Sequence, residues 1–230
     1  MKKSTLFRTL LPIIIMMAGI TAKAQSITTL AGLPGAAAAY CAGEAVKLQG
    51  NSTGTTYQWK RYPGKDITGT PVTLTETTNT LSDVPPSPGY YTYVSTASNT
   101  NCTSDVSAPT TIYALPTIKA DLTGPASACV SAVGATVLTV VASNLETTNT
   151  DAFGYTYKWL KNGQPIAGAP SQPTYTLSST ADNTIGSQAF SVQVSYIITS
   201  HGGSNCMQAS NTANVDVQAN PTTPTVTIMP

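Results

Sequence analysis

Histidine and charged side chains are scarce in this chain of 230 residues. It contains one histidine, His201, and only 9% of its residues are Asp, Glu, Lys or Arg. A metal site with two histidine ligands is therefore impossible within one chain. The ten carboxylates are scattered, without the dense Asp run of a calcium loop or a spacing that suggests the facing pair of a glycosidase. We expect no metal site and no cofactor.

Motifs for catalysis and nucleotide binding are also absent. The sequence has no nucleophile-elbow pattern, no G-x-G-x-x-G loop and no Walker loop. His201 lies in the Gly-rich segment TSHGGSNC before Cys206, which is typical of a surface loop, and no other histidine could activate a cysteine or serine. We therefore predict that the protein is not an enzyme.

Long hydrophobic runs are missing too. The longest, Leu10–Ile20, is shorter than the span of about 20 residues that crosses a membrane. Three basic residues precede it and Ala22-Lys23-Ala24 follows it, which is the pattern of a secretory signal cleaved before Gln25. We predict that residues 1–24 are a signal peptide. The mature chain then has no transmembrane segment and is secreted or held at the cell surface.

Positive charge is especially scarce in the mature chain. Four of the eleven Lys and Arg residues lie in the predicted signal, so seven basic residues face ten acidic ones, a formal charge of −3. The closest group, Lys60, Arg61 and Lys65, surrounds one predicted turn, and we interpret it as solvated. Because phosphate binding needs clustered Lys and Arg, we predict no nucleic-acid partner.

Helical periodicity is absent as well. No long stretch repeats its apolar residues with the helical period, and the helix-friendly run Ala36–Ala39 is short. Thr, Ser, Ala, Val, Gly and Pro are abundant instead. Thr and Val favour strands, whereas Gly and Pro favour turns. The composition therefore predicts an all-β fold.

What the chain does contain is an internal repeat. TTYQWKRYPGKDITG (Thr55–Gly69) and YTYKWLKNGQPIAG (Tyr155–Gly168) each place Tyr-x-Trp in a strand-like run, followed by basic residues, a Gly-containing turn and Ile-x-Gly. Trp59 and Trp159 are the only tryptophans of the chain. Because both have the same strand context, we interpret them as core residues and not as a sugar-binding platform.

Each copy continues with a strand of alternating side chains, Tyr91–Val94 in the first and Phe190–Val194 in the second. Such alternation indicates strands with one buried face. The side chains that we predict to form the structural core are Trp59, Trp159, Tyr57, Tyr157, Tyr91 and Phe190.

The order of these motifs resembles an immunoglobulin-like sandwich, in which a Trp on strand C packs between two sheets. The segment SPGYYTYV resembles the start of strand F, so the resemblance implies a corner tyrosine at Tyr91. Both copies also resemble the immunoglobulin-like and PKD-like modules of secreted Bacteroidota surface proteins, which show Cys-x-Gly before strand B and a Cys after strand F. CAGEAVKLQG (Cys41–Gly50) fits this opening, whereas CVSAVGATVLTV (Cys129–Val140) lacks the Gly. The PKD-type Gly-Asp-Gly is absent, which favours the immunoglobulin-like name.

The resemblance implies two tandem immunoglobulin-like β-sandwich domains, over residues 25–115 and 116–219. The final stretch ANPTTPTVTIMP resembles ALPTIKADLTG, the segment between the two copies. We therefore expect residues 220–230 to be a tail or the start of a truncated third module.

Four cysteines in an exported chain, two per copy, indicate a disulfide framework. The symmetry of the repeat favours the pairs Cys41–Cys102 and Cys129–Cys206, with other pairings and free thiols as alternatives. Bonded cysteines have Cα atoms within about 7 Å. An orthodox immunoglobulin topology places the start of strand B and the end of strand F at opposite ends, so the symmetric pairing requires Cys41 to lie further into the sheet.

These observations favour a non-enzymatic exported protein that acts as an adhesion or spacer module toward an extracellular protein or glycan. The alternative is a carbohydrate-binding accessory module of a polysaccharide-utilisation system, because eleven Tyr and two Trp could supply stacking faces for sugars. On an alternating strand Tyr91 and Tyr93 face one way and Tyr90 the other, so the alternative needs at least one exposed ring.

Overall fold

The computed structural model describes residues 26–51, 54–146, 149 and 151–228. The predicted signal peptide, residues 1–24, lies outside the described residues. The described part of the chain is nearly all β, with two short 3-10 helices, η1 (Leu30–Gly32) and η2 (Val130–Ala135). The prediction of an all-β fold is confirmed.

The strands form two modules that follow each other along the chain. The N-terminal module contains β1 (Ala38–Tyr40), β2 (Val46–Gln49), β3 (Thr56–Pro63), β4 (Val72–Thr73), β5 (Thr80–Asp83), β6 (Gly89–Ser98) and β7 (Thr110–Ala114). The C-terminal module contains β8 (Ile118–Thr123), β9 (Ser127–Cys129), β10 (Val137–Asn144), β11 (Tyr155–Lys161), β12 (Gln164–Pro165), β13 (Thr174–Thr176), β14 (Gly186–Tyr196), β15 (Gln208–Ala209) and β16 (Ala213–Gln218).

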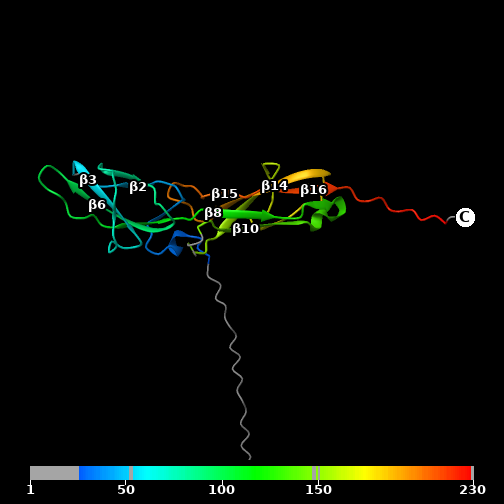
Figure 1. Ribbon diagram of the computed structural model, residues 1–230, viewed down its shortest axis with the longest axis horizontal. Coiled ribbons are helices and arrows are strands. Elements are labelled where there is room, and N and C mark those ends of the chain that lie inside the picture. Colours follow the sequence, from blue (N-terminus) through cyan, green and yellow to red (C-terminus); the bar gives the residue numbers. More distant parts are fainter. Residues whose placement is uncertain (1–25, 52–53, 147–148, 150, 229–230) are drawn as a thin grey trace, which may run out of the picture.

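Each module is a sandwich of two sheets. In the N-terminal module the order β1-β7-β6-β3-β4 forms one sheet, and β2 and β5 form the other. In the C-terminal module β12-β11-β14-β16-β9 forms one sheet, with β15 beside β14, and β13-β10-β8 forms the other. This is the strand arrangement of the immunoglobulin-like class. The modules lie end to end in an elongated molecule, and a tail leaves the end of β16 (Figure 1).

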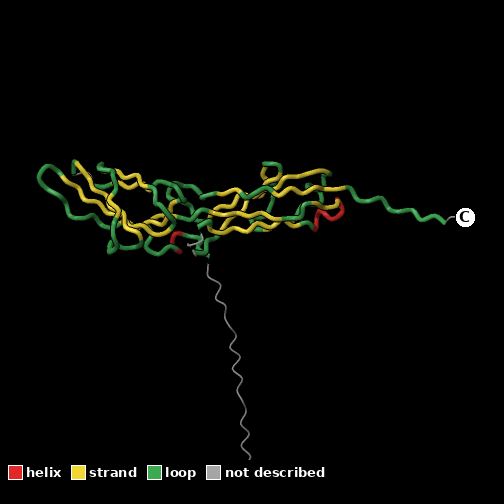
Figure 2. Tube along the Cα trace, viewed as in Figure 1, coloured by secondary structure: helices red, strands yellow, loops and turns green. Residues whose placement is uncertain are grey.

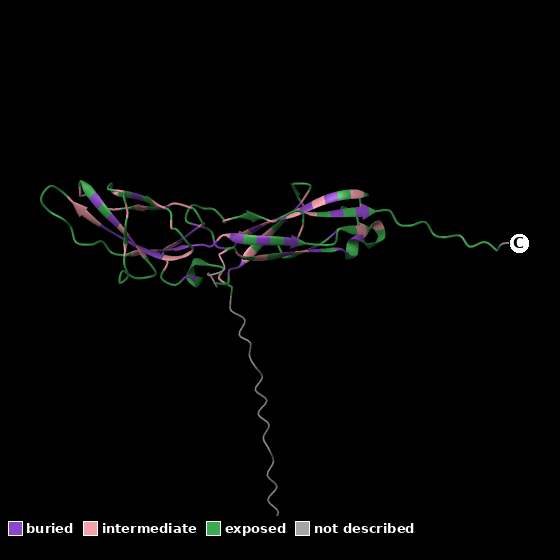
Figure 3. Ribbon diagram, viewed as in Figure 1, coloured by how far each residue is buried: buried purple, intermediate pink, exposed green. Residues whose placement is uncertain are grey.

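Alternating burial explains why these segments form strands. Every second side chain of β8 and of β14 is buried, and Figure 3 shows the same alternation along the C-terminal module. Successive side chains of a strand point to opposite faces, so such a sequence buries one face against the second sheet. Strands dominate both modules, and η2 lies at the end from which the tail leaves (Figure 2).

The two tryptophans occupy the same position in the two modules. Trp59 lies opposite Ser95 of β6, and Trp159 lies opposite Val192 of β14. Each of these partners lies six residues after the glycine that begins its strand. Both indoles are buried, with 4% and 1% of their surfaces exposed. Their indole N–H groups donate, at 3.0 and 3.1 Å, to backbone carbonyls that lie two residues before β5 and β13, strands of the opposite sheets.

The other predicted core aromatics differ in burial. Tyr57, Tyr91 and Phe190 are buried, whereas Tyr157 is only partly buried and packs against the edge of the core. The hydroxyl of Tyr91 donates to the carbonyl of Ser87 at 2.9 Å, four residues upstream. This bond back to the preceding loop is the one that a tyrosine corner makes.

The segment before β1 does not stay within its own module. Ile27 forms a parallel bridge with Phe153, and its N–H donates to the carbonyl of Ala152 at 2.7 Å. Leu33, which is 2% exposed, belongs to the same buried cluster as the core of the C-terminal module. This segment therefore crosses the junction and ties the start of the chain to the second module.

As a result the two modules differ at one sheet edge. In the C-terminal module β8 pairs antiparallel with β10, from Ile118 opposite Asn144 to Thr123 opposite Thr139. In the N-terminal module β2 corresponds to β10, and among the described residues it pairs only with β5. The place that β8 fills beside β10 thus has no counterpart beside β2 in the described part of the chain.

Candidate functional site at the junction of the modules

A disulfide joins the two modules. Cys41 is bonded to Cys206, with 5.3 Å between the Cα atoms, and Cys102 and Cys129 are free and exposed. The predicted pairs Cys41–Cys102 and Cys129–Cys206 are therefore wrong.

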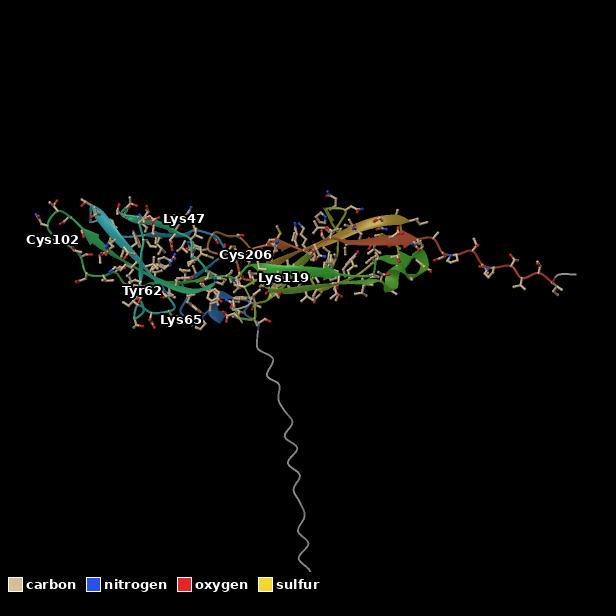
Figure 4. All side chains as sticks on the ribbon, in the orientation of Figure 1. Lys47, Tyr62, Lys65, Cys102, Lys119 and Cys206 are labelled. Atoms are coloured by element: carbon tan, nitrogen blue, oxygen red, sulfur yellow. A yellow bond between two sulfur atoms is a disulfide. The ribbon has the colours of Figure 1, made fainter. Side chains whose placement is uncertain are left out.

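The reason for the error lies in the ends of the sandwiches. Cys41 follows β1, which runs parallel to β7 and ends with Tyr40 beside Ala114, the last residue of β7. That end of the module faces the C-terminal module, whereas Cys102 lies in the β6–β7 hairpin at the opposite end. Figure 4 shows Cys102 at one extremity of the molecule and Cys206 near its middle. A bond within one module would have to span its full length.

The β14–β15 hairpin of the C-terminal module brings Cys206 to this junction. His201 lies in that hairpin, and its N–H donates to the carbonyl of Ala39 at 2.7 Å. Its ring lies 5.5 Å from the ring of Tyr40. The carboxylate of Glu44 accepts the N–H of Cys41 at 2.7 Å. His201 is thus an exposed loop residue that contacts the neighbouring module.

A row of aromatic side chains also fills the junction. Tyr113 of β7 lies 6.0 Å from Phe153, which in turn lies 5.1 Å from Tyr196 of β14. The hydroxyl of Tyr196 donates to the carbonyl of Pro116 in the intermodule segment at 2.9 Å. Since Tyr113 and Tyr196 are each 1% exposed, the junction is a continuation of the core and not a hydrated gap.

Tyr113 is also hydrogen-bonded across the junction. Its hydroxyl donates to the carboxylate of Asp151, and the side-chain amide of Asn149 donates to the Tyr113 oxygen at 3.0 Å. Burial, followed by the bond to Asp151, raises the pKa of Tyr113 well above its ordinary value. The phenol therefore stays protonated at neutral pH and keeps donating to Asp151 there.

Each module also contains a buried ion pair that supports its own core. In the N-terminal module a guanidinium nitrogen of Arg61 lies 2.7 Å from the carboxylate of Asp83, which also accepts the hydroxyl of Tyr93 at 2.7 Å. Burial, then the bond to Asp83, raises the pKa of Tyr93 above its ordinary value. All three groups have partners, so this cluster is structural.

The C-terminal module repeats this arrangement with Lys161 two residues after its tryptophan. The ammonium of Lys161 lies 2.9 Å from the carboxylate of Asp182, which also accepts the Tyr175 hydroxyl at 2.8 Å and the N–H of Ser178 at 2.7 Å. Burial alone would raise the pKa of Asp182, but these bonds outweigh it and lower that pKa below its ordinary value. The carboxylate is thus fully occupied by its own module.

The tyrosines do not form an open stacking platform. All eleven tyrosines and both tryptophans are buried or only partly exposed. Tyr90 has the ammonium of Lys65 4.1 Å from its ring centroid and Tyr113 packed edge-on against it at 4.8 Å. A groove of about 540 Å³ over β2 and β5 is lined by polar side chains with Leu48 and Leu81, and its lining contains no aromatic ring.

The described residues form neither a metal-binding cluster nor a membrane-spanning helix. In the described part of the chain no group of three or more His, Cys, Asp or Glu side chains could hold a metal ion. No helix formed by the described residues is long and apolar enough to cross a membrane.

The fold and the junction together define a protein of two tandem β-sandwich modules joined by a disulfide. No protein-family profile matches the chain, and no curated protein matches it. Among solved structures it resembles fibronectin(III)-like modules of Clostridium thermocellum CbhA, with 17% identity and a TM-score of 0.36, over 81% of this chain and 90% of that one. It also resembles the FN1-FN3 domains of chicken CNTN1, with 13% identity and a TM-score of 0.34, over 79% of this chain and 62% of that one.

Proposed function

We propose that this protein is an exported, non-enzymatic spacer, a rigid pair of immunoglobulin-like modules of the kind found in Bacteroidota surface proteins. It holds adhesive or other binding parts at a fixed separation outside the cell. The observation that carries the proposal is the Cys41–Cys206 disulfide, which joins one module to the other.

The disulfide supports export. Such bonds form and persist in oxidising compartments and are rare where glutathione and thioredoxin keep thiols reduced. The N-terminal pattern of basic residues, an apolar run and Ala22-Lys23-Ala24 supports the same compartment. We therefore place the mature chain outside the cytoplasm, secreted or at the cell surface.

The junction supports the role of a rigid spacer. Domains joined by a single linker move relative to each other unless their interface is large and apolar. Here the main chain crosses the junction at Pro116, the disulfide crosses it at Cys41, and the Ile27 bridge crosses it again. Three separate connections, with a buried aromatic row between them, oppose both bending and twisting.

Single-molecule energy transfer between dyes on Cys102 and Cys129 tests this rigidity, because these natural free thiols lie toward opposite ends of the molecule. We expect a single narrow distance distribution in the wild type. The double variant Cys41→Ser/Cys206→Ser should broaden it, because the junction then loses its covalent bond. A wild-type distribution as broad as that of the variant would contradict the spacer proposal.

A polysaccharide pull-down and a glycan array on the exported chain separate the spacer from the carbohydrate-binding alternative. We expect no saturable binding, because Lys65 and Tyr113 cover the Tyr90 ring and the other tyrosines, Tyr62 among them, are buried or only partly exposed. Saturable binding that is lost on changing Tyr62 or Tyr90 to Ala, with the thermal unfolding transition unchanged, would replace the spacer role by carbohydrate binding.

A further inference from the structure

We propose that copies of this protein join head to tail, through a disulfide between Cys129 of one copy and Cys102 of the next. Within one molecule, Cys41 and Cys206 join the first module to the second. The proposed bond uses the equivalent free cysteines to join the second module of one molecule to the first module of the next. The inference goes beyond the spacer role, since it concerns how one spacer connects to another.

Cys129 occupies the position of Cys41. Cys41 directly follows the short strand β1, and Cys129 is the last residue of the short strand β9. Each of these strands pairs parallel with the last strand of its module, β7 or β16. When the modules are aligned on the glycines that begin β6 and β14, Tyr40 and Ala128 lie opposite equivalent residues of β7 and β16. Cys41 and Cys129 are the next residues, so the correspondence holds residue by residue.

Cys102 occupies the hairpin position of Cys206. Both lie in the connection that leaves the strand opposite the tryptophan, β6 or β14. Ser107 and Ser210 align the two connections, because each bonds through both its N–H and its hydroxyl to the backbone of the residue opposite the tryptophan. Cys102 lies five residues before Ser107, and Cys206 lies four residues before Ser210.

The two free thiols lie at opposite ends of the molecule. Cys102 is at the extremity of the N-terminal module (Figure 4), and Cys129 is the N-cap of η2, at the end where the tail leaves (Figures 1 and 2). They cannot bond to each other within one copy. Each end therefore presents one half of the bond that the junction makes internally. Such a contact between different surfaces of identical molecules continues from one molecule to the next and forms an open chain unless the rotation between them closes a ring.

The segment after β16 adds a second, noncovalent connection. Val226 and Ile228 alternate with threonine and are 93% and 98% exposed, so the described tail has no packing partner of its own for these side chains. The segment follows β16 as β8 follows β7, and β8 crosses to the next module to pair with β10. In the next copy the corresponding place, beside β2, is not filled by any strand among the described residues.

The tail of one copy therefore extends the β2–β5 sheet of the next. An unpaired strand edge is a template for another extended segment, and pairing would remove the two apolar side chains from water. The same interaction places the end of β16, and with it Cys129, next to the N-terminal module of the following copy. The two thiols then take the positions that Cys41 and Cys206 take at the junction within one molecule.

Bond formation needs an oxidant, which we take to be a low-molecular-weight disulfide such as glutathione disulfide. The Cys129 thiolate attacks one sulfur of the oxidant and expels a thiolate, leaving a mixed disulfide on Cys129. The Cys102 thiolate of the next copy attacks the Cys129 sulfur and expels the second thiolate. Two electrons pass to the oxidant, which becomes two thiols, and the two protons come from the protein thiols.

The test uses the full chain, purified after export and incubated with glutathione disulfide at low protein concentration. We expect a ladder of covalent oligomers on a non-reducing gel that collapses to monomer with dithiothreitol. Mass spectrometry should identify a peptide pair containing Cys129 and Cys102. Monomer alone, or oligomers joined mainly by Cys102–Cys102 and Cys129–Cys129 bonds, would overturn the proposal.

A mixing experiment gives the sharper result. Cys102→Ser and Cys129→Ser each retain one free thiol, so neither can polymerise, and the mixture should give a covalent heterodimer several-fold faster than either variant forms a symmetric dimer. Adding Val226→Asp/Ile228→Asp to the Cys102→Ser variant should remove this preference without changing its thermal unfolding. Equal rates for mixed and symmetric dimers would mean random collision of exposed thiols and would refute the head-to-tail contact.

Discussion

Replacing Cys41 and Cys206 by serine removes the covalent bond between the modules while leaving each sandwich intact. The bond closes a loop of 165 residues. In the chain-entropy model such a cross-link contributes about 5 kcal/mol at 25 °C by restricting the unfolded chain, and strain or residual structure reduces this value. We therefore expect the double variant to lose about 3–5 kcal/mol, a large share of the stability of an ordinary domain.

Urea denaturation followed by tryptophan fluorescence measures this loss, because each module has one buried indole. The midpoint should fall. The dependence of the unfolding free energy on urea should steepen, because an unfolded chain without the cross-link exposes more surface. The matched control is Cys102→Ser/Cys129→Ser, which changes two exposed free cysteines and should alter the stability by less than about 0.5 kcal/mol. If both double variants unfold at the same midpoint, the disulfide does not constrain the unfolded chain as the structure requires.

Two further predictions concern the cores. Trp159→Ala should lower the free energy of unfolding by about 3–5 kcal/mol, because it truncates a buried side chain. Tyr157→Ala should lower it clearly less, because Tyr157 is only partly buried. Equal losses in urea denaturation would contradict the core role of the indole. Because the folded-state pKa of Asp182 lies below its ordinary value, its stabilising contribution is present above about pH 4 and is lost as the pH falls through the folded pKa. The difference in unfolding free energy between wild type and Asp182→Asn should therefore shrink from about pH 6 to about pH 2, and a constant difference would argue against a stabilising ion pair.

The elements that depend on local sequence patterns could be predicted from the sequence. Trp59 and Trp159 are both preceded by Thr-Tyr-x and followed by a basic residue and a Gly-containing turn, and this local pattern specifies a strand and the turn that ends it whatever lies further away. The alternation in Phe190–Val194 likewise determines which side chains face the opposite sheet. These features depend on neighbours within a few residues, so the repeat was sufficient to locate them.

The junction depends on contacts that no local pattern encodes. The segment before β1 has a strand-like bridge at Ile27, but its partner, Phe153, is more than a hundred residues away and belongs to the other copy. The phenol of Tyr113 and the carboxylate of Asp151 likewise meet only after the modules are placed end to end. Side chains of this kind look like ordinary strand or loop residues in the sequence.

The cysteines show why repeat symmetry alone could not determine the pairing. Two cysteines per module at equivalent positions are compatible with a bond inside each module, and equally with a bond from one module to the next. What decides between them is the end of the sandwich at which each thiol lies. Cys41 directly follows a strand parallel to β7 and so lies at the end of its module that faces forward along the chain, whereas Cys206 lies in a hairpin at the end that faces backward. By the same reasoning Cys102 lies at the backward-facing end of the first module and Cys129 at the forward-facing end of the second, and both are free. When the symmetry of the repeat is applied between successive modules, it therefore leads to the proposed bond between Cys129 of one molecule and Cys102 of the next.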